Sequence, residues 1–223
     1  MQLERTKSFY AKHGANLMLG AEMLESDNQV VLDEHLLAFS REKDFEKEAK
    51  IWPNHKTDYP PLLRFAKDND LHFLATNITR RFVNMVYRFG LDTLAYLPEA
   101  SKQFIEHFPI AYDTSLHLYK EISIMAGGHG GENLPKSQAI KDATMAHFIH
   151  ANMKEDTKFI HYHASYHSKY HESIMWYLLL LNSSLAIQTI DLVEQVDVSE
   201  LDKELIGNTD FFIVIDEDMC KTH

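Results

Sequence analysis

The chain has 223 residues, of which 45% are hydrophobic and 25% charged, a composition typical of a folded domain with a sizeable core. Its formal net charge of −11 argues against nucleic acid or an anionic membrane surface as the main partner, because both require a cationic face on the protein. The single cysteine, Cys220, excludes an intrachain disulfide, and the longest apolar run, residues 174–181, is far shorter than the ~20 residues that span a bilayer.

Five short apolar segments predict β-strands, with stretches of helical periodicity between them. The strands are expected at residues 16–22, 71–76, 158–163, 185–193 and 211–215. Near-continuous apolar strands that alternate with helices indicate βαβ units. We therefore expect an α/β fold with a mostly parallel sheet covered by helices on both faces.

Two connections between the predicted strands are too long for simple crossovers. The first, residues 27–70, carries an apolar helical stripe at Val31, Leu32, His35 and Leu36. The second, residues 78–151, holds several predicted helices. Long insertions at strand ends commonly cover a pocket. We expect a single domain over residues 1–223, with a smaller helical cap subdomain inserted at about residues 78–133.

Glu22 follows the apolar run LMLGA and should emerge at the carboxyl end of its strand. Ligands of open α/β sheets bind beyond that edge. A carboxylate there can be a ligand, a general base or an orienting partner for a histidine. It can equally cap a helix or form a salt bridge at the start of the next connection.

Asn77, Arg80 and Arg81 occupy the same topological position after the next strand. Guanidinium groups at a helix start suit a carboxylate or phosphate, because they bind such groups bidentately and helix N-termini favour anions. The alternative for each arginine is a solvated or ion-paired side chain.

Gln138 and Asp142 lie four residues apart on one stripe of a predicted helix that begins near Asn133. An acid in an otherwise apolar helix can orient a histidine or an arginine. Asp142 can also be a surface acid beside Lys141.

Four histidines fall within eleven residues at His161, His163, His167 and His171, from the end of a predicted strand to the start of a helix. Imidazole is the commonest protein metal ligand and the usual acid or base near neutral pH. The period of a strand places His161 and His163 on one side, and the four cannot all point one way. His167 and then His163 are the preferred site residues, whereas His161 is expected to be structural.

Several stretches of the chain resemble ChaN-type haem-binding uptake proteins, which belong to the Tiki and erythromycin-esterase-like superfamily. They are LGAEMLESDNQVVLDEHL, YPPLLRFAKDNDLHFLATNITRRFVNMVYRFGLDTL, KSQAIKDATMAHFI and HYHASYHSKYHESIMWYL. The resemblance covers nearly the whole chain with its motifs in the expected order, and it is greatest to lipoprotein-type members from Bacteroidetes.

The resemblance implies a parallel-sheet core with a helical subdomain and a role in haem or iron acquisition at the cell envelope. Carried over by motif, the strand-end acid of the family is Glu22 and its late histidine is His167. Its Asn-x-x-Arg-Arg element corresponds to Asn77, Arg80 and Arg81, and its Gln-x-x-x-Asp pair to Gln138 and Asp142.

The chain departs from the family pattern at its N-terminus. The first strand of the family, which ends in Gly-Glu-x-His, has no counterpart, and MQLERTK aligns with the helix that follows it. We therefore expect an N-terminally incomplete domain without a signal peptide. We expect a membrane link only through a lipid anchor, and the given sequence does not contain one. Ala164 also replaces a usual glycine, which would crowd the site beside His163.

Three functional hypotheses follow. In the first, the chain binds haem, with the iron held by a tyrosine or histidine and the propionates bound by Arg80 or Arg81. A homodimer is an open alternative to a monomer in this hypothesis. In the second, it is a hydrolase of the esterase or protease type, in which Glu22 and His167 hold a divalent metal and assist a bound water. In the third, it is an envelope interaction protein that keeps only the fold.

Overall fold

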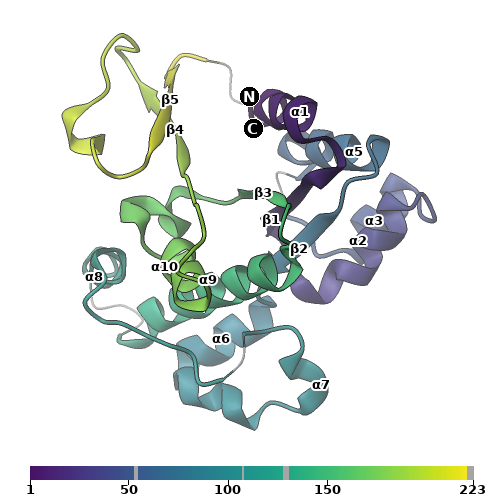
Figure 1. The fold of residues 1–223 in the computed structure, drawn as a ribbon. Coiled ribbons are helices and arrows are strands. Elements are labelled where there is room, and N and C mark those ends of the chain that lie inside the picture. Colours follow the sequence, from purple (N-terminus) through teal and green to yellow (C-terminus); the bar gives the residue numbers. More distant parts are fainter. Residues whose placement is uncertain (53–54, 107, 128–130, 220–223) are drawn as a thin grey trace.

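The computed structural model describes residues 1–52, 55–106, 108–127 and 131–219, and it confirms the predicted α/β class (Figure 1). The helices are α1 (Gln2–His13), α2 (Gln29–Leu36), α3 (Glu42–Glu48), α4 (His55–Asp58), α5 (Pro60–Asp68), α6 (Arg80–Phe89), α7 (Glu99–Lys102), α8 (His117–Met125), α9 (Asn133–Asn152) and α10 (Ile174–Leu181). The strands are β1 (Leu17–Glu25), β2 (Phe73–Asn77), β3 (Lys158–Tyr162), β4 (Ile190–Gln195) and β5 (Phe211–Asp216). Short 3-10 turns include Leu91–Tyr96, Ser165–His167, Lys169–His171 and Lys203–Leu205.

The central sheet has the strand order β2-β1-β3, and both strand pairs are parallel. Gly20 of β1 lies opposite Leu74 on one side and His161 on the other. A Cβ atom at Gly20 would lie 2.8 Å from Cζ of Phe159, so any larger residue at this position would displace the ring of Phe159. Because all three strands run the same way, their carboxyl ends meet at one edge of the sheet.

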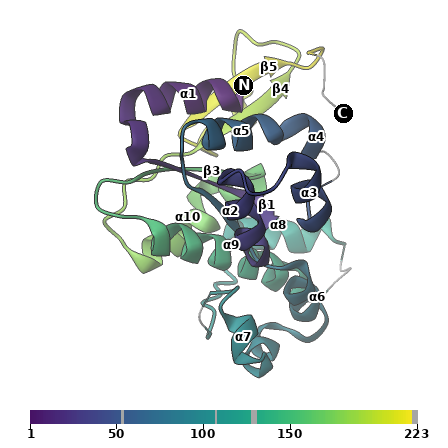
Figure 2. The same cartoon turned by 90° about the vertical axis from the view of Figure 1, so that its right-hand side faces the viewer.

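Helices cover both faces of this sheet (Figures 1 and 2). On one face, α1, α2, α3 and α5 pack on alternate residues of β1, among them Leu19, Ala21 and Met23. On the other, α9 lies against β2, and α6 and α10 pack on α9. Helix α9 is buried almost all round, which explains why it lacks a clear polar face.

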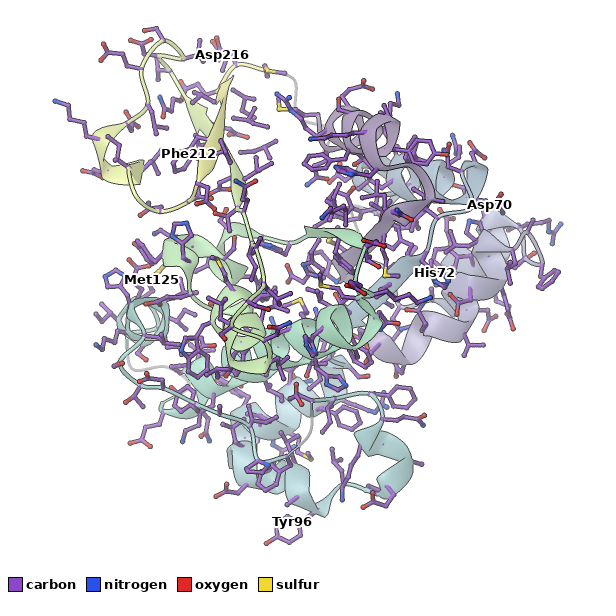
Figure 3. All side chains as sticks on the ribbon, viewed as in Figure 1. Asp70, His72, Tyr96, Met125, Phe212 and Asp216 are labelled. Carbon is purple, nitrogen blue, oxygen red and sulfur yellow. The ribbon has the colours of Figure 1, made fainter. Side chains whose placement is uncertain are left out.

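Helices α6 and α7 of the predicted insertion form a smaller group beneath α9, whereas α8 packs on α9 separately (Figures 1 and 2). Phe82 and Val86 of α6, Leu94 and Ile105 share an apolar core with Ile140 of α9. Tyr96 lies at the outer end of this group and is 88% exposed (Figure 3). The insertion thus rests on the helix that carries Asp142.

The last two strands form a separate parallel sheet, in which Ile190 lies opposite Phe211. Figure 3 labels Phe212 and Asp216 on β5, which lies apart from the central sheet. The strand predicted at residues 185–193 begins only at Ile190 and does not join the main sheet. Its side chains alternate between exposed and partly buried, as in a strand with one solvated face. In the described part of the chain, no helix is long and apolar enough to span a membrane.

Candidate functional site

Three buried side chains from distant parts of the sequence meet near the carboxyl edge of the central sheet. Glu22 projects from β1, Asp142 from α9, and His167 from the 3-10 turn that follows β3. The Nε2–H of His167 donates to Oε1 of Glu22 at 3.0 Å, and its Nδ1–H donates to Oδ1 of Asp142 at 2.5 Å. The structure therefore brings together three of the residues that the sequence singled out.

Further hydrogen bonds complete this network of Glu22, Asp142 and His167. The backbone N–H of Ala164 donates to Oε2 of Glu22 at 3.0 Å, and the hydroxyl of Tyr119 donates to Oδ2 of Asp142 at 3.0 Å. The amide nitrogen of Gln138 lies 3.0 Å from Nδ1 of His167, but both groups are donors when His167 is an imidazolium, so this is a contact and not a hydrogen bond. Each carboxylate oxygen therefore has a partner, as buried charges require.

Asn77 supports the network from β2 without entering it. Its Nδ2 donates to the backbone carbonyl of Glu22 at 2.9 Å, while its Oδ1 is buried without a partner among the described residues. The predicted site position of Asn77 at the sheet edge thus agrees with the structure, and its contact is with the backbone of Glu22.

The three groups shift each other's protonation. Burial opposes the charge on His167, but Asp142 and Glu22 outweigh it and raise the pKa of His167 to about 9. Burial likewise opposes the charge on Glu22, yet the hydrogen bond and charge of His167 lower the pKa of Glu22 to about 2. Burial raises the pKa of Asp142 in spite of its contact with His167. His167 is accordingly an imidazolium near neutral pH.

An imidazolium held in this way is a poor metal ligand and a poor base. Both nitrogens of His167 carry protons that are donated to carboxylates, so neither has a lone pair to offer. Within the described ranges, no group of three or more His, Cys, Asp or Glu side chains could hold a metal ion. The predicted metal and hydrolytic roles of Glu22 and His167 therefore find no support in this geometry.

The two histidines at the end of β3 are held differently. Nε2 of His161 lies 2.7 Å from the hydroxyl oxygen of Thr76, which itself donates to the carbonyl of Ala21. Nδ1 of His163 lies 3.1 Å from the carbonyl oxygen of Ala164. Since a carbonyl only accepts, His163 must carry its proton on Nδ1, which leaves the lone pair on Nε2.

Both of these histidines are neutral near neutral pH. Burial, followed by the positive charge of His167, lowers the pKa of His163 to about 4. Burial and the neighbouring histidines lower the pKa of His161 as well. The rings of His161 and His163 are 5.2 Å apart, which agrees with the prediction that they share one side of the strand.

The structure separates the two predicted arginines. Both begin α6 and both are exposed. The guanidinium of Arg81 pairs with Asp27 at 2.5 Å and lies over the ring of Phe82. Arg80 has no ion pair within the described ranges, so only Arg80 presents an uncommitted guanidinium to an incoming anion.

Two polar side chains that complete this region, those of Tyr119 and Thr76, are not predicted as site residues from the sequence. Tyr119 comes from α8, inside the insertion, and no local pattern connects it with Asp142. Thr76 was placed in a strand, but its hydroxyl contact with His161 depends on the register across β1. Only the period-2 alternation of the strands could have suggested the latter pairing.

Two comparisons with known proteins found matches to the chain. The model of a family described as haem-binding uptake, Tiki superfamily, ChaN, matches residues 1–178. Among solved structures, the fold resembles one described as cofacial heme binding to ChaN of Campylobacter jejuni, with a TM-score of 0.64 and 17% sequence identity. That match covers 94% of this chain and 77% of the other. No curated protein matches the chain.

Proposed function

The chain belongs to the ChaN family of haem-binding uptake proteins in the Tiki superfamily, and we propose that it binds haem with His163 as a ligand to the iron. The observation that carries this proposal is the orientation of His163. Its Nδ1–H is fixed to the carbonyl of Ala164, and Nε2 has no hydrogen-bond partner among the described residues.

This is the arrangement that iron ligation needs. A ligating histidine must be neutral, and it almost always donates its other N–H to a carbonyl or carboxylate, which fixes the ring orientation. Histidine is a common axial ligand of haem iron. His163 meets these requirements with its own backbone neighbour, so the donor set of the site fits haem.

The buried network of Glu22, Asp142 and His167 positions this ligand. Glu22 accepts the backbone N–H of Ala164, and the backbone carbonyl of Ala164 accepts the Nδ1–H of His163, so the carboxylate and the iron ligand are joined through the single residue Ala164. The charge on His167 also keeps the nearby ring of His163 deprotonated. Glu22 and His167 therefore act as positioning residues, and neither touches the iron.

Arg80 is the residue that we propose for a haem propionate. It lies at the N-terminus of α6, where the helix dipole favours an anion, and its guanidinium is uncommitted within the described ranges. It follows β2, whereas His163 follows β3, and these outer strands lie two spacings, or about 10 Å, apart. The iron and the propionates of one porphyrin span a distance of this order.

Haem or iron acquisition at the cell envelope is the setting that we propose for this binding. It is supported by the family, whose description includes uptake. The description of Campylobacter ChaN as a heme-binding protein supports the ligand.

Titration of the purified chain with haemin tests the proposal. We expect a shifted Soret band that saturates at a fixed ratio of haem to chain. His163→Ala should weaken binding at least tenfold and change the Soret position, because the iron loses its protein ligand. His72→Ala is the matched control, since His72 is exposed and lies before β2 (Figure 3); it should bind haemin as the unsubstituted chain does.

Two results would count against the proposal in different ways. A featureless titration of the unsubstituted chain that never saturates would remove haem binding altogether. An unchanged spectrum and affinity in His163→Ala would keep haem binding and assign the iron to another residue.

A further inference from the structure

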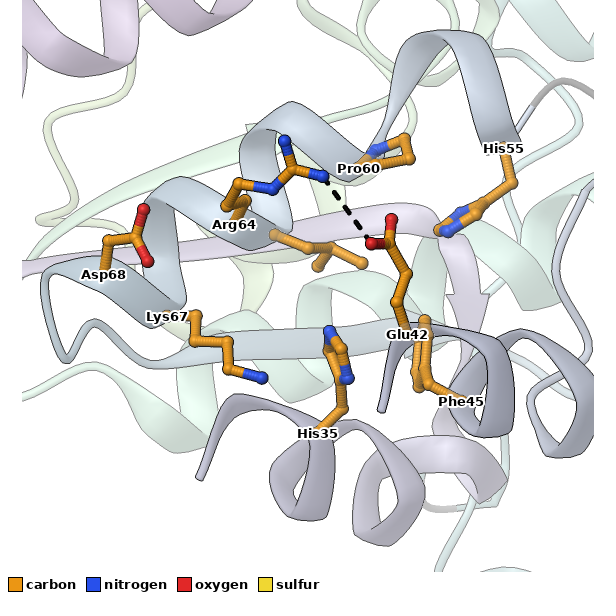
Figure 4. Close-up of a pocket in the computed structure, with 9 residues that line it drawn as sticks. His35, Glu42, Phe45, His55, Pro60, Arg64, Lys67 and Asp68 are labelled. Carbon is orange, nitrogen blue, oxygen red and sulfur yellow. Dashed lines mark ion pairs between the residues drawn. The ribbon is translucent and has the colours of Figure 1, made fainter. Parts of the chain in front are cut away.

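A pocket of about 340 Å³ lies among α2, α3, α4 and α5, on the face of the central sheet opposite α9 (Figure 4). The residues of its floor are largely buried, and charged side chains surround its opening. None of the residues of the Glu22–Asp142–His167 network lines it. Its volume is at the lower end of the range for small-molecule sites.

Three aromatic rings form a row along this floor. His35 stacks on Phe45 with ring centroids 4.7 Å apart, and Phe45 is followed by His55 at 6.0 Å. His35 and His55 are 7% and 3% exposed, and both project into the pocket in Figure 4. Such a row offers a flat ligand a surface for stacking.

His35 has an unmet hydrogen-bonding group. Its Nδ1 is buried and has no partner among the described residues. A buried polar atom left in this way destabilises the fold, so its retention at a pocket points to a partner that arrives from outside. Burial and Lys67 lower the pKa of His35, against a smaller opposing effect of a backbone hydrogen bond to Ser40, and burial also lowers that of His55. A neutral imidazole has one N–H, so the tautomer of His35 with its proton on Nδ1 is the one that can donate to an acceptor in the pocket.

Two cations, Arg64 and Lys67, and two acids, Glu42 and Asp68, line the opening. Glu42 faces Arg64, and Asp68 lies beyond Lys67, away from His35, in Figure 4, so an anion is favoured beside Lys67 only. Lys67 lines the pocket and points toward His35 in Figure 4, and it has no ion pair with any described acid. Arg64 contacts Glu42 only at 3.6 Å, with both side chains at least half exposed, so this ion pair is weak and easily exchanged. The ammonium of Lys67 and the guanidinium of Arg64 thus lie at the opening, and the three aromatic rings lie at the bottom of the pocket.

We propose that this pocket is a second binding site, which takes a small aromatic carboxylate. The carboxylate lies between Lys67 and the N–H of His35, and the flat body of the ligand lies against the row formed by His35, Phe45 and His55. Leu63 closes the apolar side of the pocket. The site lies across the sheet from His163, so it is independent of the haem site.

Benzoate is the probe that tests this assignment, with benzamide, acetate and inorganic phosphate as comparisons. Binding is followed through the imidazole signals of His35 and His55 in NMR spectra, up to about 10 mM probe, where even a weak site is populated. We expect benzoate to saturate these signals. Benzamide and acetate should bind at least tenfold more weakly, because one lacks the charge and the other lacks the ring.

Lys67→Gln should weaken benzoate binding about fivefold to tenfold and leave the fold intact, since Gln is a good helix former at this partly exposed position. Lys43→Gln, on the exposed side of α3, is the matched control and should change nothing. His163→Ala should bind benzoate with unchanged affinity, even where it has lost haemin.

Each alternative result overturns the assignment. Unmoved His35 and His55 signals would show that the pocket takes no such ligand, and stronger binding of phosphate or benzamide would show the wrong ligand class. If Lys67→Gln binds benzoate as well as Lys43→Gln does, the proposed anion contact is wrong. Displacement of benzoate by haemin in equimolar amounts would mean that the pocket belongs to the haem site.

Discussion

His163 and His167 lie one short turn apart, yet the structure treats their rings in opposite ways. His167 is 3% exposed, donates from both nitrogens to buried carboxylates, and is held as a cation. His163 is neutral, donates from Nδ1 to a backbone carbonyl, and leaves Nε2 without a protein partner among the described residues.

The difference shows how a fold divides structural and binding roles among identical side chains. A network in which every polar atom is satisfied holds a segment in one conformation, because any displacement would leave a buried charge unpaired. A nitrogen without a partner contributes nothing to that rigidity and remains open for a ligand. The sequence pattern H-x-x-x-H alone carries no information about which histidine plays which part.

The largest expected effect comes from breaking the network of Glu22, Asp142 and His167, in which every polar atom has a partner. We call it the closed side of the comparison, and His163 with its free Nε2 the open side. Asp142→Ala should lower the free energy of unfolding by about 3–5 kcal/mol, because it leaves His167 with one carboxylate fewer and the hydroxyl of Tyr119 without its acceptor. Urea unfolding followed by circular dichroism measures this loss.

Two variants serve as controls for Asp142→Ala. Asp142→Asn keeps an acceptor for His167 and should lose less than half as much. Asp92→Ala, at an exposed position outside the network, should stay within about 0.5 kcal/mol of the parent. A loss below about 1 kcal/mol for Asp142→Ala would show that the network does not hold the turn.

The second prediction is a stability maximum near pH 6.5, because the two histidines respond to pH in opposite directions. The pKa of His167 is raised from 6.5 to about 9, so its stabilising contribution is complete below pH 6.5 and is lost as the pH rises to 9. The pKa of His163 is lowered from 6.5 to about 4, so the unfolded chain binds more protons between these values and stability falls as the pH drops. Each contribution amounts to about 3 kcal/mol.

His163→Ala separates these two contributions. Urea unfolding from pH 4 to 9 should show a shallower acid slope for this variant and an unchanged slope above pH 6.5. The lowered pKa values of His35, His55, His161 and Glu22 leave part of the acid slope in place. The raised pKa of Asp142 acts in the opposite direction and reduces that slope. An alkaline slope that is absent from the parent chain would contradict the assignment of a cationic His167.

The sequence predicted the closed side of the comparison better than the open side. Glu22, Arg80 and His167 all follow strands of a predicted parallel sheet, whose carboxyl ends share one edge, so the sequence predicts that they lie at a common rim; the structure joins Glu22 and His167 directly. The helical period puts Asp142 on one stripe with Gln138, but it leaves open whether Asp142 orients a histidine or lies on the surface. The shared sheet edge is a consequence of topology, which a sequence expresses directly, whereas the contact of Asp142 with His167 is seen only in the structure.

The remaining features depend on contacts that no local pattern encodes. Arg80 and Arg81 are adjacent and alike in sequence, but only Arg81 reaches Asp27 across the sheet edge. The pocket around His35 arises because α5 brings Lys67 over α2, two elements separated by a long connection. The separate sheet of β4 and β5 was missed for the same reason, since apolar runs predict strands without predicting which strands pair.

The smallest effect tests whether His161 belongs to the closed or the open side. Thr76→Val keeps the shape of a fully buried side chain but removes the hydroxyl that accepts from His161 and donates to the carbonyl of Ala21. We expect a loss of about 1 kcal/mol in urea unfolding, the usual net value of such hydrogen bonds. Haemin affinity should change less than threefold, because the ring of His163 is fixed by Ala164 and not by Thr76. If haemin affinity falls instead as far as it does in His163→Ala, then His161 takes part in iron ligation. The binding role would then belong to both His161 and His163, and only His167 would be purely structural.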